Sequence, residues 1–391
     1  MLKQVFLLTA AILISGCSSV RHAVPENLLN DTRVSGMQDI RAFSGIPSDA
    51  IKKDFIKLLE QEGKEAPFFN FQNPQTYHML AISGGAGNGA YGAGLLSGWS
   101  QAGTRPVFKI VTGISTGAII APFVFLGSKY DDRLKEFYTK YSTKDVAQIR
   151  IPFVNSFAST RPLESLIGHY FDAALLKEIA AEYNKGRRLY VGTTNLDAER
   201  LVIWDMGKIA AIGDEQSLKL FRKIILASSS IPIVFPPVYL NVEADNKMYD
   251  EMHVDGGVSK QVFFLYDVLQ GFNVALKEKG IDSSRNHYII YVIRNGYVEP
   301  FYKEVSDNLS AITARTVEAL TNAQSVGDLY QLYYFAKSSN GDFNLAYIPA
   351  DYFLEFKELV DPIAMRRLFD LGFQEAKQGY NWKKAPPGLK R

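Results

Sequence analysis

A serine held between two glycines is the residue of this chain best suited to covalent chemistry. Ser115 lies in the pattern G-x-S-x-G at residues 113–117, after an apolar segment of strand character and before an apolar segment of helix character. On such a strand-to-helix turn the glycines avoid clashes and leave the serine hydroxyl exposed. The N–H groups at the start of the helix then point toward developing negative charge. The pattern therefore predicts a nucleophilic serine.

A glycine-rich turn precedes this serine in the chain. Residues 83–89 read Ser-Gly-Gly-Ala-Gly-Asn-Gly, and such a turn lets backbone N–H groups approach an anion closely. Residues 87–92 also match the dinucleotide fingerprint G-x-G-x-x-G, which requires an acidic residue about twenty positions further on, at the end of a second strand. The second strand here ends at Gly113 without an acid. An oxyanion hole for acyl transfer is the better interpretation, because a nucleophile turn follows the very next strand.

Asp255 is the candidate base. It stands in the turn Asp-Gly-Gly at residues 255–257, where an aspartate is by itself most often a simple turn residue. His253 lies two positions earlier on an extended segment and would share a face with it, so a Ser-His-Asp triad stays open beside a Ser-Asp pair. The remaining histidines are scattered and lack metal-ligand spacing, so we predict neither a metal site nor a cofactor.

The order of these segments resembles the patatin-like phospholipase family. Residues 81–94 are similar to the first block of that family, and residues 112–118 match its second. Residues 227–237 resemble the segment that leads into the family's aspartate. With the Asp-Gly-Gly turn, the blocks occur in the order of the family, and together they cover residues 77–260.

The resemblance implies a catalytic dyad, with Ser115 as nucleophile and Asp255 as its base. The chain departs from the family at two positions, since the family often has a third glycine where Ala86 stands and a basic residue where Asn88 stands. Ala86 then needs a compatible backbone φ, and Asn88 leaves stabilisation of the oxyanion to amides and to the helix dipole. Neither change removes a reacting group. The implied oxyanion hole is formed by the backbone amides of Gly84, Gly85, Ala86 and Gly87.

Strands and helices that alternate along the chain must position these residues. Buried strands are predicted at residues 78–82, 107–111, 188–193, 200–205 and 287–293. Helices are predicted at residues 89–101, directly after residue 117, and at 306–335 and 362–378. Such alternation predicts an α/β fold with a mostly parallel central sheet covered by helices on both faces. The family resemblance implies a patatin-like three-layer sandwich, followed here by a helical C-terminal extension.

The first residues carry a targeting signal. Lys3 gives a positive start, and residues 5–14 form an apolar run too short to span a bilayer. Ile-Ser-Gly-Cys at residues 14–17 resembles the bacterial lipobox, which implies that Cys17, the sole cysteine, is acylated and becomes the mature N-terminus. Ser18 lacks the aspartate that resembles an inner-membrane retention signal. We therefore expect a lipid-anchored protein of the bacterial cell envelope, with the outer membrane favoured.

The chain divides into four predicted parts. The signal peptide covers residues 1–16, and a lipidated N-terminus and tether follow at 17–75. This second part contains one short amphipathic helix, capped by Ser48. The patatin-like hydrolase domain covers residues 76–300, and a mainly helical C-terminal region covers residues 301–391.

Composition narrows the function classes. Lys and Arg number 43 against 41 Asp and Glu, and the net charge of +2 gives no basic face for nucleic acid. Apolar stretches at 122–126 and 231–237 are either core or the walls of an acyl groove. We expect a lipid acyl hydrolase of the phospholipase A or lysophospholipase type, whose partner is membrane lipid, and we predict no protein partner. An esterase for short soluble acyl esters and a non-catalytic, lipid-binding envelope lipoprotein are the alternatives.

Overall fold

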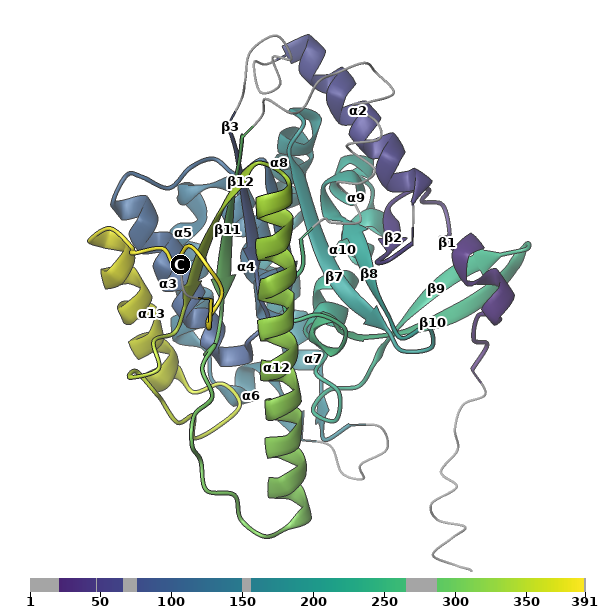
Figure 1. Ribbon diagram of the computed structural model, residues 1–391. Helices are drawn as coiled ribbons and strands as arrows, with labels where there is room; N and C mark the ends of the chain where they lie inside the picture. The colour runs from purple at the N-terminus through teal and green to yellow at the C-terminus, as the bar shows by residue number, and fades with distance from the viewer. Residues whose placement is uncertain (1–20, 47, 66–75, 150–155, 265–286, 390–391) are drawn as a thin grey trace, which may run out of the picture.

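A mixed β-sheet forms the centre of the molecule (Figure 1). The computed structural model describes residues 21–46, 48–65, 76–149, 156–264 and 287–389. Over these residues the sheet has ten strands in the order β1-β9-β10-β7-β4-β3-β11-β12, with β8 pairing to β7 and β2 to β8. The strands are β1 (Arg33–Val34), β2 (Arg41–Phe43), β3 (Thr76–Ile82), β4 (Ile110–Ile114), β7 (Arg188–Asn195), β8 (Arg200–Asp205), β9 (Val238–Ala244), β10 (Lys247–Asp255), β11 (His287–Arg294) and β12 (Gly341–Tyr347). A separate small sheet pairs β5 (Gln148–Ile149) with β6 (Ala158–Ser159).

The middle of the sheet is parallel. Strands β7, β4, β3, β11 and β12 run in one direction, and β4 and β7 are buried along their whole length. Parallel strands that are covered on both faces have almost continuous apolar sequences, which made them visible in the chain. The predicted α/β class with a parallel central sheet is confirmed. Strands β8, β2, β10, β9 and β1 extend the sheet in antiparallel fashion.

Helices cover both faces of this sheet. The core on one face is closed by α3, α4, α5, α7, α8, α9, α10 and α13, and the core on the other by α2 and the long α12 (Figure 1). Neighbouring strand residues such as Leu80 and Ala81 point into different cores, as the strand period of two requires. The helices are α2 (Asp49–Glu65), α3 (Gly89–Gln101), α4 (Thr116–Leu126), α5 (Asp131–Lys140), α6 (Thr143–Val146), α7 (Arg161–Tyr170), α8 (Ala173–Asn184), α9 (Met206–Ile212), α10 (Glu215–Ser228), α12 (Leu309–Ser338) and α13 (Pro362–Lys377).

The strands differ from the sequence prediction at several places, and β9, β10 and β12 are among those that were not predicted. The strand expected at 107–111 begins only at Ile110, which pairs with Met79 and Arg188, whereas Val107 is 64% exposed. Strand β12 lies in the region expected to be mainly helical and adds a parallel strand beside β11. Its sequence interrupts apolar residues with Asp342 and Asn344, so it lacks the continuous apolar run that marked the other parallel strands.

Within the predicted tether, residues 21–46 pack onto the sheet rather than forming a loose linker. Strand β1 pairs with β9 and β2 pairs with β8, so this segment adds to the antiparallel edge of the sheet. The Ser48 hydroxyl accepts a hydrogen bond from the Ile51 N–H at 3.4 Å, at the start of α2. Cys17 and the predicted signal peptide lie outside the described residues. Among the helices that the structure describes, none has the length and apolar character needed to cross a membrane.

A buried ion pair fixes α2 to the sheet. The Asp54 carboxylate accepts hydrogen bonds from Arg188 Nε at 2.5 Å and from the Tyr183 hydroxyl at 2.7 Å. The Arg188 side chain is fully buried and the Asp54 side chain is 4% exposed. Taking both charges out of water is tolerable because each satisfies the other. This contact holds the N-terminal helix against the first residue of β7.

Replacement of Asp54 by alanine should destabilise the protein strongly. Arg188 would keep its buried charge without the carboxylate that balances it, and breaking a buried pair in this way costs about 3–5 kcal/mol. Urea denaturation followed by tryptophan fluorescence measures the free energy of unfolding. Glu215→Ala, which breaks an exposed ion pair with Lys219, serves as the control and should cost less than about 1 kcal/mol. Equal effects of the two changes would contradict the assigned role of Asp54.

Candidate active site

Ser115 lies at a strained turn between β4 and α4. Its backbone angles are φ 55° and ψ −123°, a combination that residues other than glycine rarely adopt. The flanking glycines make room for this turn. A Cβ at Gly113 would lie 2.2 Å from the Gly117 carbonyl oxygen, and a Cβ at Gly117 would lie 2.3 Å from the Ile82 carbonyl oxygen. The sharp turn predicted from G-x-S-x-G is therefore present, and both glycines are required by close contacts.

The register of the sheet brings Asp255 to this turn. Strand β8 pairs with one edge of β7. On the other edge, β4 pairs with the first part of β7 and β10 pairs with the part that follows. Ile114 at the end of β4 pairs with Gly192, and Asp255 at the end of β10 pairs with Thr193. The two strands run toward each other, because β4 is parallel to β7 and β10 is antiparallel. Their ends meet at adjacent residues of β7.

The Ser115 hydroxyl donates a hydrogen bond to Asp255. The distance from Ser115 Oγ to Asp255 Oδ2 is 2.6 Å, and the two residues are 6% and 5% exposed. The second carboxylate oxygen, Oδ1, accepts from the Gly257 N–H at 2.7 Å, which fixes the orientation of the carboxylate. Burial raises the pKa of Asp255 to about 7, and the hydrogen bonds from Ser115 and Gly257 limit that rise. A carboxylate with such a pKa can both accept and return a proton near neutral pH.

His253 does not take part in this contact. Its Nδ1 lies 2.9 Å from Thr193 Oγ1, and its Nε2 lies 3.0 Å from Glu251 Oε2, which is also paired with Arg41. The ring is completely buried, and burial lowers its pKa. Both ring nitrogens are therefore engaged away from Ser115, which favours a Ser-Asp pair over the triad that the sequence left open.

The glycine-rich turn lies beside the serine, but its amides are not equivalent. The Gly84 N–H donates to the Gln261 carbonyl at 2.9 Å, so the expectation that it serves an oxyanion is corrected. Over the described residues, the amides of Gly85, Ala86 and Gly87 have no hydrogen-bond acceptor. Close contacts fix the position of this turn, since a Cβ at Gly84 would lie 3.2 Å from Ser115 Cβ.

Gly85 and Ala86 show why this turn is unusual. A Cβ at Gly85 would lie 1.9 Å from the Asn295 carbonyl oxygen, so only glycine fits there. Ala86 has φ 47°, in the left-handed region that costs residues with a Cβ about 1–2 kcal/mol. Asn88, where the resembling family often has a basic residue, lies half-buried before α3. Ala86, for which the sequence predicted the need for a compatible backbone φ, therefore has a left-handed conformation.

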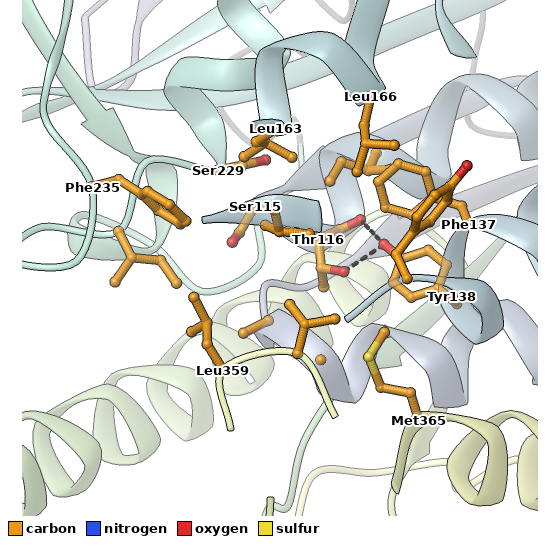
Figure 2. Close-up of a pocket in the computed structure, with 17 residues that line it drawn as sticks. Ser115, Thr116, Phe137, Tyr138, Leu163, Leu166, Ser229, Phe235, Leu359 and Met365 are labelled. Carbon is orange, nitrogen blue, oxygen red and sulfur yellow. Dashed lines mark hydrogen bonds between the residues drawn. The ribbon is translucent and has the colours of Figure 1, made fainter. Parts of the chain in front are cut away.

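Two further residues hold the nucleophile and were not singled out in the sequence. The Ser228 hydroxyl accepts from the Ser115 N–H at 2.9 Å and donates to the Gly192 carbonyl at 2.7 Å. The Tyr138 hydroxyl donates to the Thr116 carbonyl at 3.0 Å and lies 2.5 Å from Thr116 Oγ1 (Figure 2). Ser228 lies in the block at 227–237, whereas a tyrosine within α5 carries no local signal of such a role.

A family model matches the part of the chain that contains this site. Residues 80–266 match the family model of the patatin-like phospholipases. The matched range contains the glycine-rich turn, Ser115 and Asp255. A comparison with curated proteins gave no match.

A solved structure of VipD from Legionella pneumophila aligns with 78% of this chain at 13% identity and a TM-score of 0.34. The alignment spans 66% of that chain. This likeness is too slight to bear on the activity.

An apolar pocket opens beside Ser115 (Figure 2). It has a cavity volume of about 80 Å³ and lies between α4, α5, α7 and the segments that precede β9 and α13. Ile231 and Phe235 form part of its wall, whereas Phe123 and Phe125 of the other apolar stretch are buried in the core. Further walls come from Ile119, Phe137, Leu163, Leu166, Leu359 and Met365.

An open cleft also reaches the serine and the aspartate. It runs between the glycine-rich turn, the end of β11 and the N-terminal half of α12. Its rim exposes apolar side chains that the core does not use, namely Ile233, Val258, Val317, Leu320 and Phe353. Over the described residues, no group of three His, Cys, Asp or Glu side chains is arranged to hold a metal ion.

Asp255→Asn should make the protein more stable, and more so at high pH. In the unfolded chain an aspartate ionises near pH 4, but the folded protein holds this proton up to about pH 7. Between these values the parent loses stability as the pH rises, because the unfolded state releases the proton first. From pH 5 to pH 8 the difference in unfolding free energy between variant and parent should grow by about 2.6 kcal/mol. Urea denaturation at both pH values measures this, and a pH-independent difference would contradict a raised pKa.

Proposed function

We propose that this protein is a lipid acyl hydrolase of the phospholipase A or lysophospholipase type, which cleaves carboxylic esters through a Ser115–Asp255 dyad. One observation carries the proposal: the buried hydrogen bond of 2.6 Å from Ser115 Oγ to Asp255 Oδ2 at a strained strand-to-helix turn. The family match at residues 80–266 supports a lipid hydrolase at the level of the family.

The proposed reaction passes through an acyl-enzyme. Ser115 Oγ attacks the ester carbonyl carbon while its proton moves to Asp255 Oδ2, and the carbonyl oxygen becomes an oxyanion. The unpaired amides of the glycine-rich turn receive this charge. Collapse of the adduct breaks the ester C–O bond, and Asp255 returns the proton to the departing alcohol. Water then attacks the acyl-enzyme with Asp255 as base, and the fatty acid leaves.

The pocket beside Ser115 favours long acyl chains. Its walls are almost entirely carbon, so a polar acyl group would lose water without gaining hydrogen bonds. Each buried methylene of a fatty acyl chain contributes about 0.8 kcal/mol of transfer free energy. The open cleft leaves space for the remainder of the lipid on the route to solvent.

We also propose that the protein works at a membrane surface. The lipobox-like segment ending at Cys17 favours acylation and attachment to the bacterial cell envelope, with the outer membrane preferred. Two or more acyl chains hold a protein on a membrane firmly. Such an anchor raises the effective concentration of lipid substrate at the cleft.

Hydrolysis assays on the full chain in detergent micelles test this function. The parent should release fatty acid from a diacyl phospholipid or a lysophospholipid, and Ser115→Ala and Asp255→Asn should each lose at least about 10³-fold in kcat. Ser97→Ala, which removes a buried hydroxyl that donates to the Ala93 carbonyl within its own helix, is the matched control and should keep its rate. On p-nitrophenyl esters, kcat/KM should rise at least about tenfold from a C4 to a C12 chain.

The two alternatives predict different outcomes in the same assays. A faster rate on C4 than on C12 esters would identify an esterase for short soluble substrates. Binding of phospholipid vesicles by the parent without any release of fatty acid would identify a lipid-binding lipoprotein. Either result would overturn the proposal.

A further inference from the structure

Arg294 is a buried cation that forms no ion pair with a carboxylate among the described residues. It ends β11 and is 4% exposed. Its Nη1 donates to the Gly84 carbonyl at 2.9 Å and to Ser83 Oγ at 3.3 Å, and its Nη2 lies 3.5 Å from Asn322 Oδ1. Over the described residues its Nε has no hydrogen-bond partner. Asp328, whose charge acts on Arg294, is itself engaged with Lys260 at 3.7 Å.

Four other arginines with side chains no more than 8% exposed differ from Arg294 in this respect. Each of the four pairs with a carboxylate, in the pairs Arg41–Glu251, Arg105–Asp131, Arg187–Glu182 and Arg188–Asp54. A buried charge that lacks a partner is costly, so it needs a reason beyond packing. Burial lowers the pKa of Arg294 to about 10, which leaves the side chain protonated at neutral pH. The positive charge is therefore permanent under ordinary conditions.

The position of this charge points to the reaction site. Arg294 lines the open cleft together with Ser115 and Asp255. Its bond to the Gly84 carbonyl reaches the same peptide unit that carries the Gly85 N–H, one of the unpaired donors. A cation bound to the oxygen of a peptide polarises it and makes its N–H a stronger donor. The charge thus acts on the oxyanion donor through one peptide group.

The residue after Arg294 fixes the same turn. The Asn295 N–H donates to Ser83 Oγ at 2.8 Å, and its side-chain amide donates to the Ser83 carbonyl at 2.9 Å. The Asn295 side chain also accepts from the Gly92 N–H at 3.1 Å, at the start of α3. The end of β11 therefore holds the glycine-rich turn from one side at several points.

We propose that Arg294 is a positioning residue for acyl transfer, which clamps the glycine-rich turn and supplies the fixed positive charge that stabilises the oxyanion formed at Ser115. This inference rests on the proposed hydrolase function. It explains why Asn88 can stand where the resembling family often has a basic residue. The positive charge reaches the glycine-rich turn from β11 instead. The same charge could instead receive the phosphate of a lipid headgroup, and the test separates these two anions.

The test compares Arg294→Met, Arg294→Lys and the parent as full chains on a neutral p-nitrophenyl ester, which contains no phosphate. Arg294→Met should lower kcat about 10²- to 10³-fold and leave KM within about threefold, as expected for loss of an interaction made with the oxyanion. Arg294→Lys keeps the charge, and its kcat should be at least about tenfold higher than that of Arg294→Met. Arg187→Met is the matched control, because Arg187 is buried near the opposite end of β7 and should change melting temperature rather than kcat.

The inhibition constant of a trifluoromethyl ketone is a second measurement, and a purely structural role of Arg294 would not change it. Its adduct with Ser115 carries an oxyanion, so Arg294→Met should weaken inhibition by about the same factor as kcat/KM. Binding of an ether lipid, which forms no oxyanion, should stay unchanged.

The results that would contradict this inference differ from those that would contradict the proposed hydrolase function. An unchanged kcat in Arg294→Met, or a loss confined to KM on phospholipids, would overturn the inference while leaving the hydrolase intact. A parent that hydrolyses no ester would overturn both proposals together.

Discussion

The hydrogen bond between Ser115 and Asp255 is the interaction on which the rest of this site depends. The two residues are 140 positions apart in sequence and meet only because β4 and β10 end at adjacent residues of β7. A slip of one residue in either strand would turn one of the two side chains to the other face of the sheet. The core on both faces of the sheet therefore serves to fix a register as much as to provide stability.

Unfavourable local features are concentrated at this end of the sheet. Ser115 and Ala86 have positive φ angles, Asp255 is buried with a raised pKa, and Arg294 is buried without a carboxylate. Each of these lowers the stability of the folded state, and each is held in place by a surrounding structure that is densely packed. Elsewhere the buried arginines at positions 41, 105, 187 and 188 are each paired with a carboxylate, and the helices close two extensive apolar cores. Such a separation is expected where function requires groups that folding alone would not favour.

Sequence alone identified the features that depend on local order. The glycines around Ser115 and the continuous apolar runs of β3, β7 and β11 mark a strand-turn-helix unit and a parallel sheet directly. It could not place contacts between distant segments. The bond from Gly84 to Gln261, the burial of His253 against Glu251 and the approach of Arg294 to the turn all depend on the pairing of strands far apart in the chain. Strand β12 was missed because it interrupts its apolar residues with polar ones.

The central claim is that Asp255 activates Ser115 directly, and the rate of labelling by a fluorophosphonate as a function of pH tests it most directly. The account predicts labelling that maps to Ser115, rises about tenfold per pH unit below pH 7 and levels off above it, because Asp255 must be ionised to accept the proton. In Asp255→Asn the labelling should be lost. Labelling of that variant at the rate of the parent, or no labelling of the parent at any pH, would contradict the account.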